Sequence, residues 1–107
     1  MGRWRVAPDG GRPEGRDCAH VDGIGPAPEV GEPLCRECAR RGWAWVGLRL
    51  CLTCGHLGCC DSSRGAHATA HYESTGHPIA RCLGTGCARP GRRWAWCYAD
   101  EVYLWPR

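Results

Sequence analysis

The sequence predicts a small α+β domain with a short antiparallel sheet and one main helix, stabilised by something other than an apolar core. Leu, Ile, Val and Phe supply only 14 of the 107 residues, below the roughly 20% that a chain needs to bury a core. Ten residues are Cys, and short strand-like and helix-like segments alternate with Gly and Pro. A domain of this size and composition depends on disulfides or metal ions for its stability.

The first half of the chain is predicted to contain a tail, a linker and one strand. Residues 1–16 are rich in Gly, Pro and Arg and have no apolar period, which predicts a disordered tail before a single domain over residues 17–107. Residues 22–33 form a second stretch rich in Gly and Pro. Residues 43–50 (WAWVGLRL) have the aromatic and β-branched content of a strand.

The second half of the chain supplies the helix and the remaining strands. A turn rich in Cys and Gly is predicted over residues 51–61, followed by a helix over residues 65–75. Ser62 or Ser63 can cap the start of this helix, and Gly76 and Pro78 end it. Further strands are predicted over residues 79–83, 94–98 and 102–105, with an Arg- and Gly-rich loop over residues 84–93.

Charge and hydropathy narrow the function classes. The formal net charge of +3 is too small to predict a nucleic-acid partner. No apolar run approaches the roughly 18 residues of a membrane span, and the N-terminus lacks the apolar segment of an export signal. We therefore expect a cytoplasmic monomer without membrane contact. The absence of Lys, Asn, Gln and Phe beside abundant Arg, Ala and Gly is typical of GC-rich coding and predicts a bacterial origin.

Cys and His recur at the spacing of zinc ligands. A CxxC turn brings two thiolates to about 2.3 Å from one zinc ion, and this chain has two such turns followed by a further Cys and three His. His67 and His71 are four residues apart, so they lie on one face of the predicted helix. The candidate ligands are Cys18, His20, Cys35, Cys38, Cys51, Cys54, Cys59, His67, His71, His77, Cys97 and Asp100. The sequence thus predicts a zinc-stabilised domain. The CxxC turns and the His residues supply two zinc sites, and Cys18, His20, Cys97 and Asp100 supply a third.

Two other interpretations of the Cys and His residues are less consistent with the pattern. A disulfide framework accounts for the Cys content but not for His at ligand spacing. A metalloprotease HExxH motif needs a Glu base where this chain has Ala68. We therefore expect no catalytic activity.

The ligand pattern resembles the UBP-type zinc finger, the ubiquitin-binding domain of many deubiquitinases. The resemblance covers residues 18–103, and CGHLGCCDSS followed by HATAHYESTGHP is similar to the bacterial branch of the family. The resemblance implies one zinc site from Cys35, Cys38, Cys59 and His67, a second from Cys51, Cys54, His71 and His77, and a third from Cys18, His20, Cys97 and Asp100. Family members commonly have Cys at the position of Asp100. The residues alone leave open that His67 and His71 share one ion.

The resemblance also implies an aromatic slot that takes the C-terminal Gly-Gly of ubiquitin. Trp96, Tyr98 and Tyr103 match its aromatic positions, although Trp96 and Tyr98 also suit the core. Asp61 stands where the family has the Arg that holds the carboxylate, and an acidic side chain repels a carboxylate. This reversal argues against ubiquitin as the ligand. Arg49, at a position where the family has Trp, or Arg64 can supply a replacement guanidinium.

We therefore expect a non-catalytic interaction module that binds a protein or peptide C-terminal tail with Trp96, Tyr98, Tyr103 and Arg49. The alternative is a nucleic-acid-binding zinc protein that uses the Arg-rich loop over residues 84–93, although that loop lacks interleaved aromatic residues. Cys60, Cys82 and Cys87 fall outside the ligand pattern, and Cys82 and Cys87 can pair on oxidation.

Overall fold

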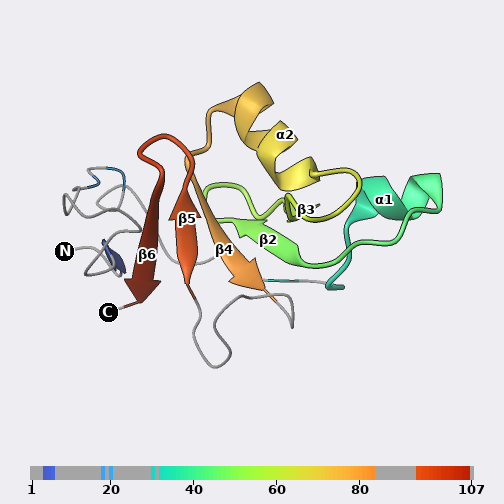
Figure 1. Cartoon of the computed structure of the whole chain (residues 1–107), viewed down its shortest axis with the longest axis horizontal. Coiled ribbons are helices and arrows are strands. Elements are labelled where there is room, and N and C mark those ends of the chain that lie inside the picture. Colours follow the sequence, from blue (N-terminus) through green and yellow to red (C-terminus); the bar gives the residue numbers. More distant parts are fainter. Residues whose placement is uncertain are drawn as a thin grey trace.

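The computed structural model of the chain describes residues 4–6, 18, 20, 30, 32–83 and 94–106. One antiparallel sheet runs in the order β1-β6-β5-β4-β2-β3, with two helices beside it (Figure 1). Its strands are β1 (Trp4–Val6), β2 (Leu48–Cys51), β3 (Leu57–Cys59), β4 (Ile79–Leu83), β5 (Ala95–Cys97) and β6 (Val102–Pro106). The helices are α1 (Arg36–Arg41) and α2 (His67–Thr75). The predicted small α+β domain with an antiparallel sheet is confirmed.

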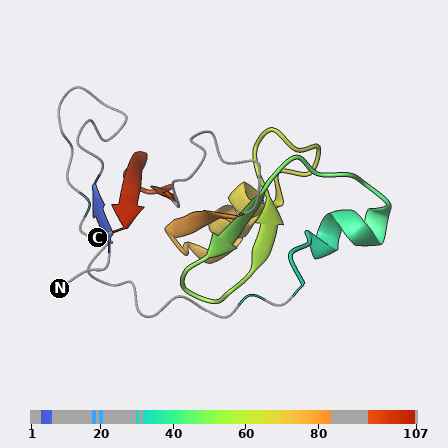
Figure 2. The ribbon, with the colours of Figure 1, turned by 90° about the horizontal axis from the view of Figure 1, so that it is seen from below.

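The helices cover one end of the sheet. Helix α2 contacts β2 and β3, and α1 contacts β3. Figure 2 shows α1 at the opposite end of the molecule from β1 and β6. Among the residues described, neither helix has the length or the apolar character that a membrane crossing requires.

The buried core is small and contains many Cys residues. One cluster joins aliphatic side chains of the central strands, and it consists of Cys18, Leu50, Leu52, Ile79, Ala95, Cys97, Val102 and Leu104. A second cluster consists of Cys35, Cys38, Leu48 and Cys59, with Trp43, Trp45 and Leu83 packed against it. Both clusters contain candidate zinc ligands, so the scarce aliphatic side chains pack around the thiols.

Three elements near the CxxC turns differ from the prediction. Helix α1 was not predicted, because its six residues lie between Cys and Gly and show no apolar period. The predicted strand over residues 43–50 is shorter, and part of the predicted turn forms β3. A Cβ atom on Gly58 would lie only 2.6 Å from the backbone nitrogen of Ala68, so a residue without a side chain lets β3 and α2 approach closely.

The start of α2 also corrects the prediction. The helix begins at His67 after Ala66, which has a left-handed backbone with φ 44° and makes no side-chain cap. The backbone N–H of His67 instead donates to Cys59 Sγ at 3.2 Å. A sulfur atom thus takes the role expected of Ser62 or Ser63, and the Ser63 hydroxyl accepts from Val46 N–H at 2.8 Å.

The N-terminal segment departs from the expected disordered tail at three residues. Trp4–Val6 form β1 and pair antiparallel with β6, with Arg5 opposite Trp105. This pairing joins residues about a hundred positions apart, which local composition cannot predict. The remainder of the predicted tail, most of the linker over residues 22–33 and the loop over residues 84–93 lie outside the described residues.

Candidate metal centres and aromatic pocket

The first cluster joins α1, β3 and the start of α2. Cys35 precedes α1, Cys38 lies within it, and Cys59 ends β3. Nδ1 of His67 lies 3.3 Å from Cys35 Sγ and 3.4 Å from both Cys38 Sγ and Cys59 Sγ. The Cys38 and Cys59 sulfurs are 3.6 Å apart. All three thiols are buried, so one imidazole nitrogen caps a triangle of sulfur atoms.

The second cluster joins the end of β2 to the other end of α2. Cys51 Sγ lies 3.5 Å from His77 Nδ1, and Cys54 Sγ lies 3.3 Å from His71 Nε2. The two imidazole nitrogens are 3.3 Å apart. His67 and His71 therefore face different clusters, although they are one helical turn apart, and the geometry does not place them on a shared ion.

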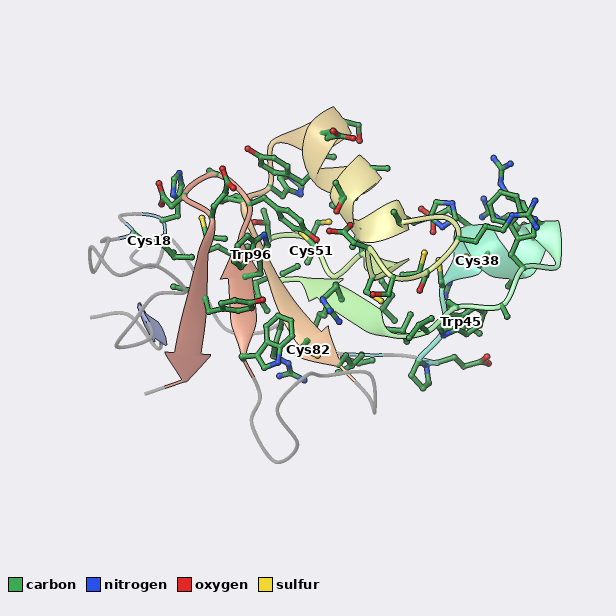
Figure 3. The ribbon with its side chains drawn as sticks, viewed as in Figure 1. Cys18, Cys38, Trp45, Cys51, Cys82 and Trp96 are labelled. Carbon is green, nitrogen blue, oxygen red and sulfur yellow. The ribbon has the colours of Figure 1, made fainter. Side chains whose placement is uncertain are left out.

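The third cluster joins the N-terminal segment to the turn after β5. His20 Nδ1 lies 2.8 Å from Asp100 Oδ2, 3.7 Å from Cys97 Sγ and 3.9 Å from Cys18 Sγ. Asp100 Oδ2 is 3.6 Å from Cys97 Sγ. Figure 3 shows Cys18, Cys51 and Cys38 at separate places along the molecule, which corresponds to three distinct clusters.

The distances within each cluster can be tested against zinc. Bonds of about 2.3 Å to sulfur and about 2.0–2.1 Å to nitrogen or oxygen separate tetrahedral sulfur–nitrogen pairs by roughly 3.5 Å and sulfur–sulfur pairs by roughly 3.8 Å. The first two clusters match these edges within a few tenths of an ångström. In every cluster the four ligand atoms lie within 4.8 Å of one another. The short contact between His20 and Asp100 is a hydrogen bond that a bound ion would lengthen. The residues therefore fit four-coordinate zinc in all three clusters.

Two of the candidate ligand thiols, Cys18 and Cys38, have a strongly raised pKa. Burial, aided by hydrogen bonds to Asp100 and Cys97, raises the pKa of Cys18 to about 12. Burial and the neighbouring Cys59 and Cys35 likewise raise the pKa of Cys38 to about 12. Zinc binds thiolates, so its binding displaces the protons of these two thiols.

One contact that the sequence did not predict links the first two clusters. His56 Nε2 lies 2.7 Å from Glu37 Oε2 on α1, and the His56 ring stacks on His71 with a centroid distance of 4.1 Å. Burial alone would raise the pKa of Glu37, but the hydrogen bond to His56 and its charge hold that pKa below its usual value. The pair thus connects α1 to a candidate ligand on α2.

An aromatic pocket of about 210 Å³ lies on the sheet beside the turn after β3. It brings together the four predicted binding residues Arg49, Trp96, Tyr98 and Tyr103. Its other lining residues are Cys60, Asp61, Ser62 and Trp94. Trp94 was not predicted, although the period of two that places Trp94, Trp96 and Tyr98 on one face of an extended segment marks it. Arg64 does not line the pocket.

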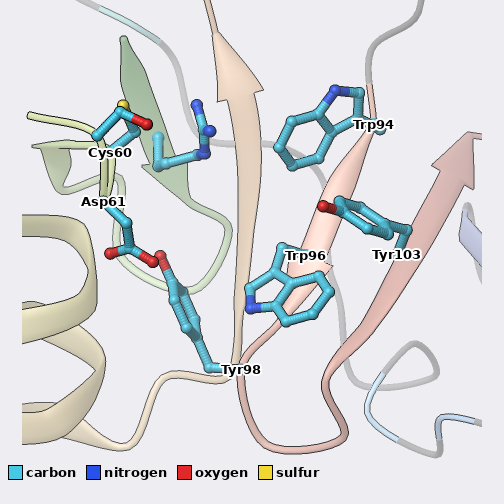
Figure 4. A pocket seen from close by; sticks show the side chains of 8 residues that line it. Cys60, Asp61, Trp94, Trp96, Tyr98 and Tyr103 are labelled. Carbon is cyan, nitrogen blue, oxygen red and sulfur yellow. The ribbon is translucent and has the colours of Figure 1, made fainter. Parts of the chain in front are cut away.

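The two charged side chains of the pocket have different surroundings. Nη1 of Arg49 donates to the Leu48 carbonyl at 3.0 Å, and its guanidinium lies 4.7 Å from the Trp94 ring centroid. Asp61 accepts a hydrogen bond from Thr69 on α2. Figure 4 shows Asp61 and Tyr98 on one side of the pocket, with Trp94 and Tyr103 on the other. The Tyr103 ring meets Trp94 and Trp96 edge-on at 5.2 and 4.8 Å.

Cys82 and Cys60, which lie outside the three clusters, differ in oxidation state. Cys82 is disulfide-bonded, and Cys87, its expected partner on oxidation, lies outside the described residues. Cys60 is a buried free thiol beside Ser63 Oγ at 3.5 Å.

Comparison with known proteins gives consistent matches. Residues 35–106 match the model of the Zn-finger in ubiquitin-hydrolases and other proteins. A curated relative, ubiquitin carboxyl-terminal hydrolase 14 of Schizosaccharomyces pombe, is 38% identical over 55% of this chain and 8% of its own length. The NAD-dependent deacetylase sir2A of Dictyostelium discoideum is 30% identical over 65% of this chain and 11% of its own length. The chain thus spans only a small part of these two relatives.

A solved structure covers more of the chain. The solution structure of a protein from the bacterium Rhodopseudomonas palustris is 44% identical, with a TM-score of 0.70 over 85% of this chain and 83% of that one. The likeness to a bacterial protein agrees with the origin predicted from composition.

Proposed function

This chain belongs to the family of zinc fingers found in ubiquitin-hydrolases and other proteins, and from that premise we propose that it is a non-catalytic module that binds the C-terminal tail of a peptide or protein. In this proposal each of the three clusters holds one zinc ion. Four protein ligands for each ion leave no open coordination position for hydrolytic chemistry. The ions would stabilise the fold, and the aromatic pocket would bind the ligand.

The observation that carries the proposal is the placement of one guanidinium in an aromatic pocket. A carboxylate is recognised best by an Arg fork, and Arg49 is held in place by the Leu48 carbonyl and the Trp94 ring. Nη1 of Arg49 donates to the Leu48 carbonyl at 3.0 Å and to Cys82 Sγ at 3.4 Å. A guanidinium has five N–H donors, so those on Nη2 and Nε are left for a ligand carboxylate. The surrounding aromatic walls suit a slim tail without large side chains.

Asp61 gives this pocket a second charged group besides Arg49. Its carboxylate lines the wall beside Tyr98 (Figure 4), where it can accept a hydrogen bond from a main-chain N–H of the tail. A ligand carboxylate placed beside Asp61 would be repelled. We therefore propose that the terminal carboxylate binds at Arg49 and that the preceding amides face Asp61. This arrangement differs from the ubiquitin recognition that the family resemblance implies.

Titration of the zinc-loaded chain with peptides ending in Gly-Gly, followed by Trp fluorescence and calorimetry, tests the proposal. The matched ligand control is the same peptide with a C-terminal amide, which should bind at least about tenfold more weakly because it lacks the charge-assisted hydrogen bonds. Arg49→Gln should weaken binding similarly, whereas Arg64→Gln, outside the pocket, should not. Equal affinity for the acid and amide peptides, or no response to either, would exclude carboxylate recognition.

A further inference from the structure

Helix α1 lies at one end of the molecule (Figure 1), and exposed basic residues gather on this helix and on a segment near it. We call this region the Trp43 surface, and it consists of Arg40, Arg41, Trp43, Val46 and Arg64. The three Arg side chains are exposed, and Val46 is 63% exposed. None of these residues lines the aromatic pocket or belongs to a metal cluster.

Two chain segments are fixed together to form the Trp43 surface. Helix α1 ends at Gly42, and the Trp43 N–H donates to the Cys38 carbonyl at 2.8 Å. The following segment is tied to the turn before α2, because Val46 N–H donates to Ser63 Oγ at 2.8 Å and Cys60 N–H donates to the Gly47 carbonyl at 3.0 Å. These bonds place Arg64 beside Trp43, although the two are 21 positions apart in the sequence.

Trp43 holds two guanidinium groups. The guanidinium carbon of Arg64 lies 4.1 Å from the Trp43 ring centroid, and that of Arg41 lies 5.0 Å from it. Within the described part of the chain, neither group has a carboxylate partner. Glu37, one helical turn before Arg41, is bonded to His56 instead. The indole restricts both guanidiniums before any ligand arrives, so a ligand would immobilise less side-chain freedom.

The chemistry of the Trp43 surface favours an acidic protein ligand over a nucleic acid. Strand-tracking nucleic-acid sites offer free aromatic faces for base stacking, whereas here Arg side chains already contact the indole. Paired guanidinium forks match carboxylates and phosphates. The exposed Val46, whose N–H donates to Ser63 next to Arg64, adds an apolar contact that suits a protein ligand. We propose that the Trp43 surface docks an acidic segment of a partner protein, with clustered Asp and Glu side chains on Arg41 and Arg64 and an apolar side chain on Val46. The helix dipole accounts for basic residues at the end of α1, but Arg64 lies on another segment.

Fluorescence anisotropy of the zinc-loaded full chain with a short labelled peptide of Asp and Glu around one central Leu tests this proposal. We expect binding that weakens as the salt concentration rises from about 50 to about 500 mM. The double variant Arg41→Gln/Arg64→Gln should bind about tenfold more weakly, and Val46→Ser should also lose affinity. Arg92→Gln/Arg93→Gln changes the net charge by the same amount and serves as the control. The zinc content of each variant verifies that it is folded.

The outcomes separate this proposal from its competitors. The proposal is supported if peptide binding weakens in Arg41→Gln/Arg64→Gln and in Val46→Ser while the control variant binds within about twofold of the wild type. Equal weakening by the control variant would overturn it, since attraction would then follow net charge alone. Absence of peptide binding at low salt would also overturn it. Tighter binding of single-stranded DNA than of the peptide, lost with Arg41 and Arg64, would reassign the surface to nucleic acid. Tail binding in the aromatic pocket should be unchanged in all these variants, so the two proposals can fail separately.

Discussion

Replacement of Asp100 tests whether the third cluster is a zinc site with a carboxylate ligand. Structural zinc sites with four ligands bind with about 10–16 kcal/mol, so one ligand contributes about 2.5–4 kcal/mol on average. Loss of that share weakens binding by roughly a hundredfold to a thousandfold. Asp100→Ala leaves only Cys18, His20 and Cys97. We expect the wild type to bind three zinc ions and Asp100→Ala to retain two when zinc is limiting.

Native mass spectrometry in the presence of a competing chelator measures this stoichiometry. Asp100→Cys supplies a thiolate and should keep three ions against a stronger chelator than the wild type tolerates. Glu73→Ala removes an equal charge from the exposed face of α2 and should keep all three. Two ions in the wild type would discard the third site. Three ions in Asp100→Ala, held as tightly as in the wild type, would remove Asp100 from the ligand set.

Three further predictions concern the metal-dependent fold. Complete chelation of zinc should abolish the near-UV circular dichroism of the chain, because so few aliphatic side chains remain to hold it; a retained native signal contradicts this. Zinc affinity should fall by about tenfold per pH unit of acidification for each thiol that loses its proton on binding, because Cys18 and Cys38 without zinc have a pKa raised to about 12. Chelator competition at two pH values measures this slope, and an affinity that does not change with pH contradicts the prediction. Gly58→Ala should lower the free energy of unfolding by about 2 kcal/mol or more, because its Cβ would lie 2.6 Å from Ala68 N on α2. Gly42→Ala, with open space around its Cβ but φ +70°, should cost only about 1 kcal/mol in the same thermal unfolding assay, and an equal loss in both variants would refute the packing argument.

The elements that the sequence predicted well are those whose ends carry a local signal. Strand β4 spans Ile79–Leu83 as predicted, and α2 ends where predicted at Gly76, whose left-handed backbone has φ 77°. In contrast, the start of α2 was wrong because a thiol sulfur, rather than a hydroxyl, accepts the first N–H. Helix α1 was missed for a related reason. Its six residues have no apolar face, and Cys35 at its start and Cys38 within it converge with Cys59 and His67.

The candidate site shows a similar division. Ligand spacing and the family resemblance together predicted which Cys and His residues converge. Local patterning could not predict contacts formed by folding, such as His56 with Glu37 or Arg64 with Trp43, because no periodicity marks them in the sequence. The pocket was predicted only in part, because the family resemblance marks Trp96, Tyr98 and Tyr103 but not Trp94, which alternates with Trp96 and Tyr98 along the sequence.

Metal clusters and pocket are linked through the chain itself. Asp61 lies two residues after Cys59, and Trp96 and Tyr98 flank Cys97, so ligand and pocket side chains alternate along the same short segments. Cys97 is fully buried toward the third cluster, while its two neighbours face the pocket. If zinc holds these segments, the walls of the pocket keep their geometry only while the ions are bound. Removal of zinc should therefore abolish tail binding together with the fold, whereas loss of the third ion alone should loosen the wall formed by Trp96 and Tyr98 and leave Arg49 in place.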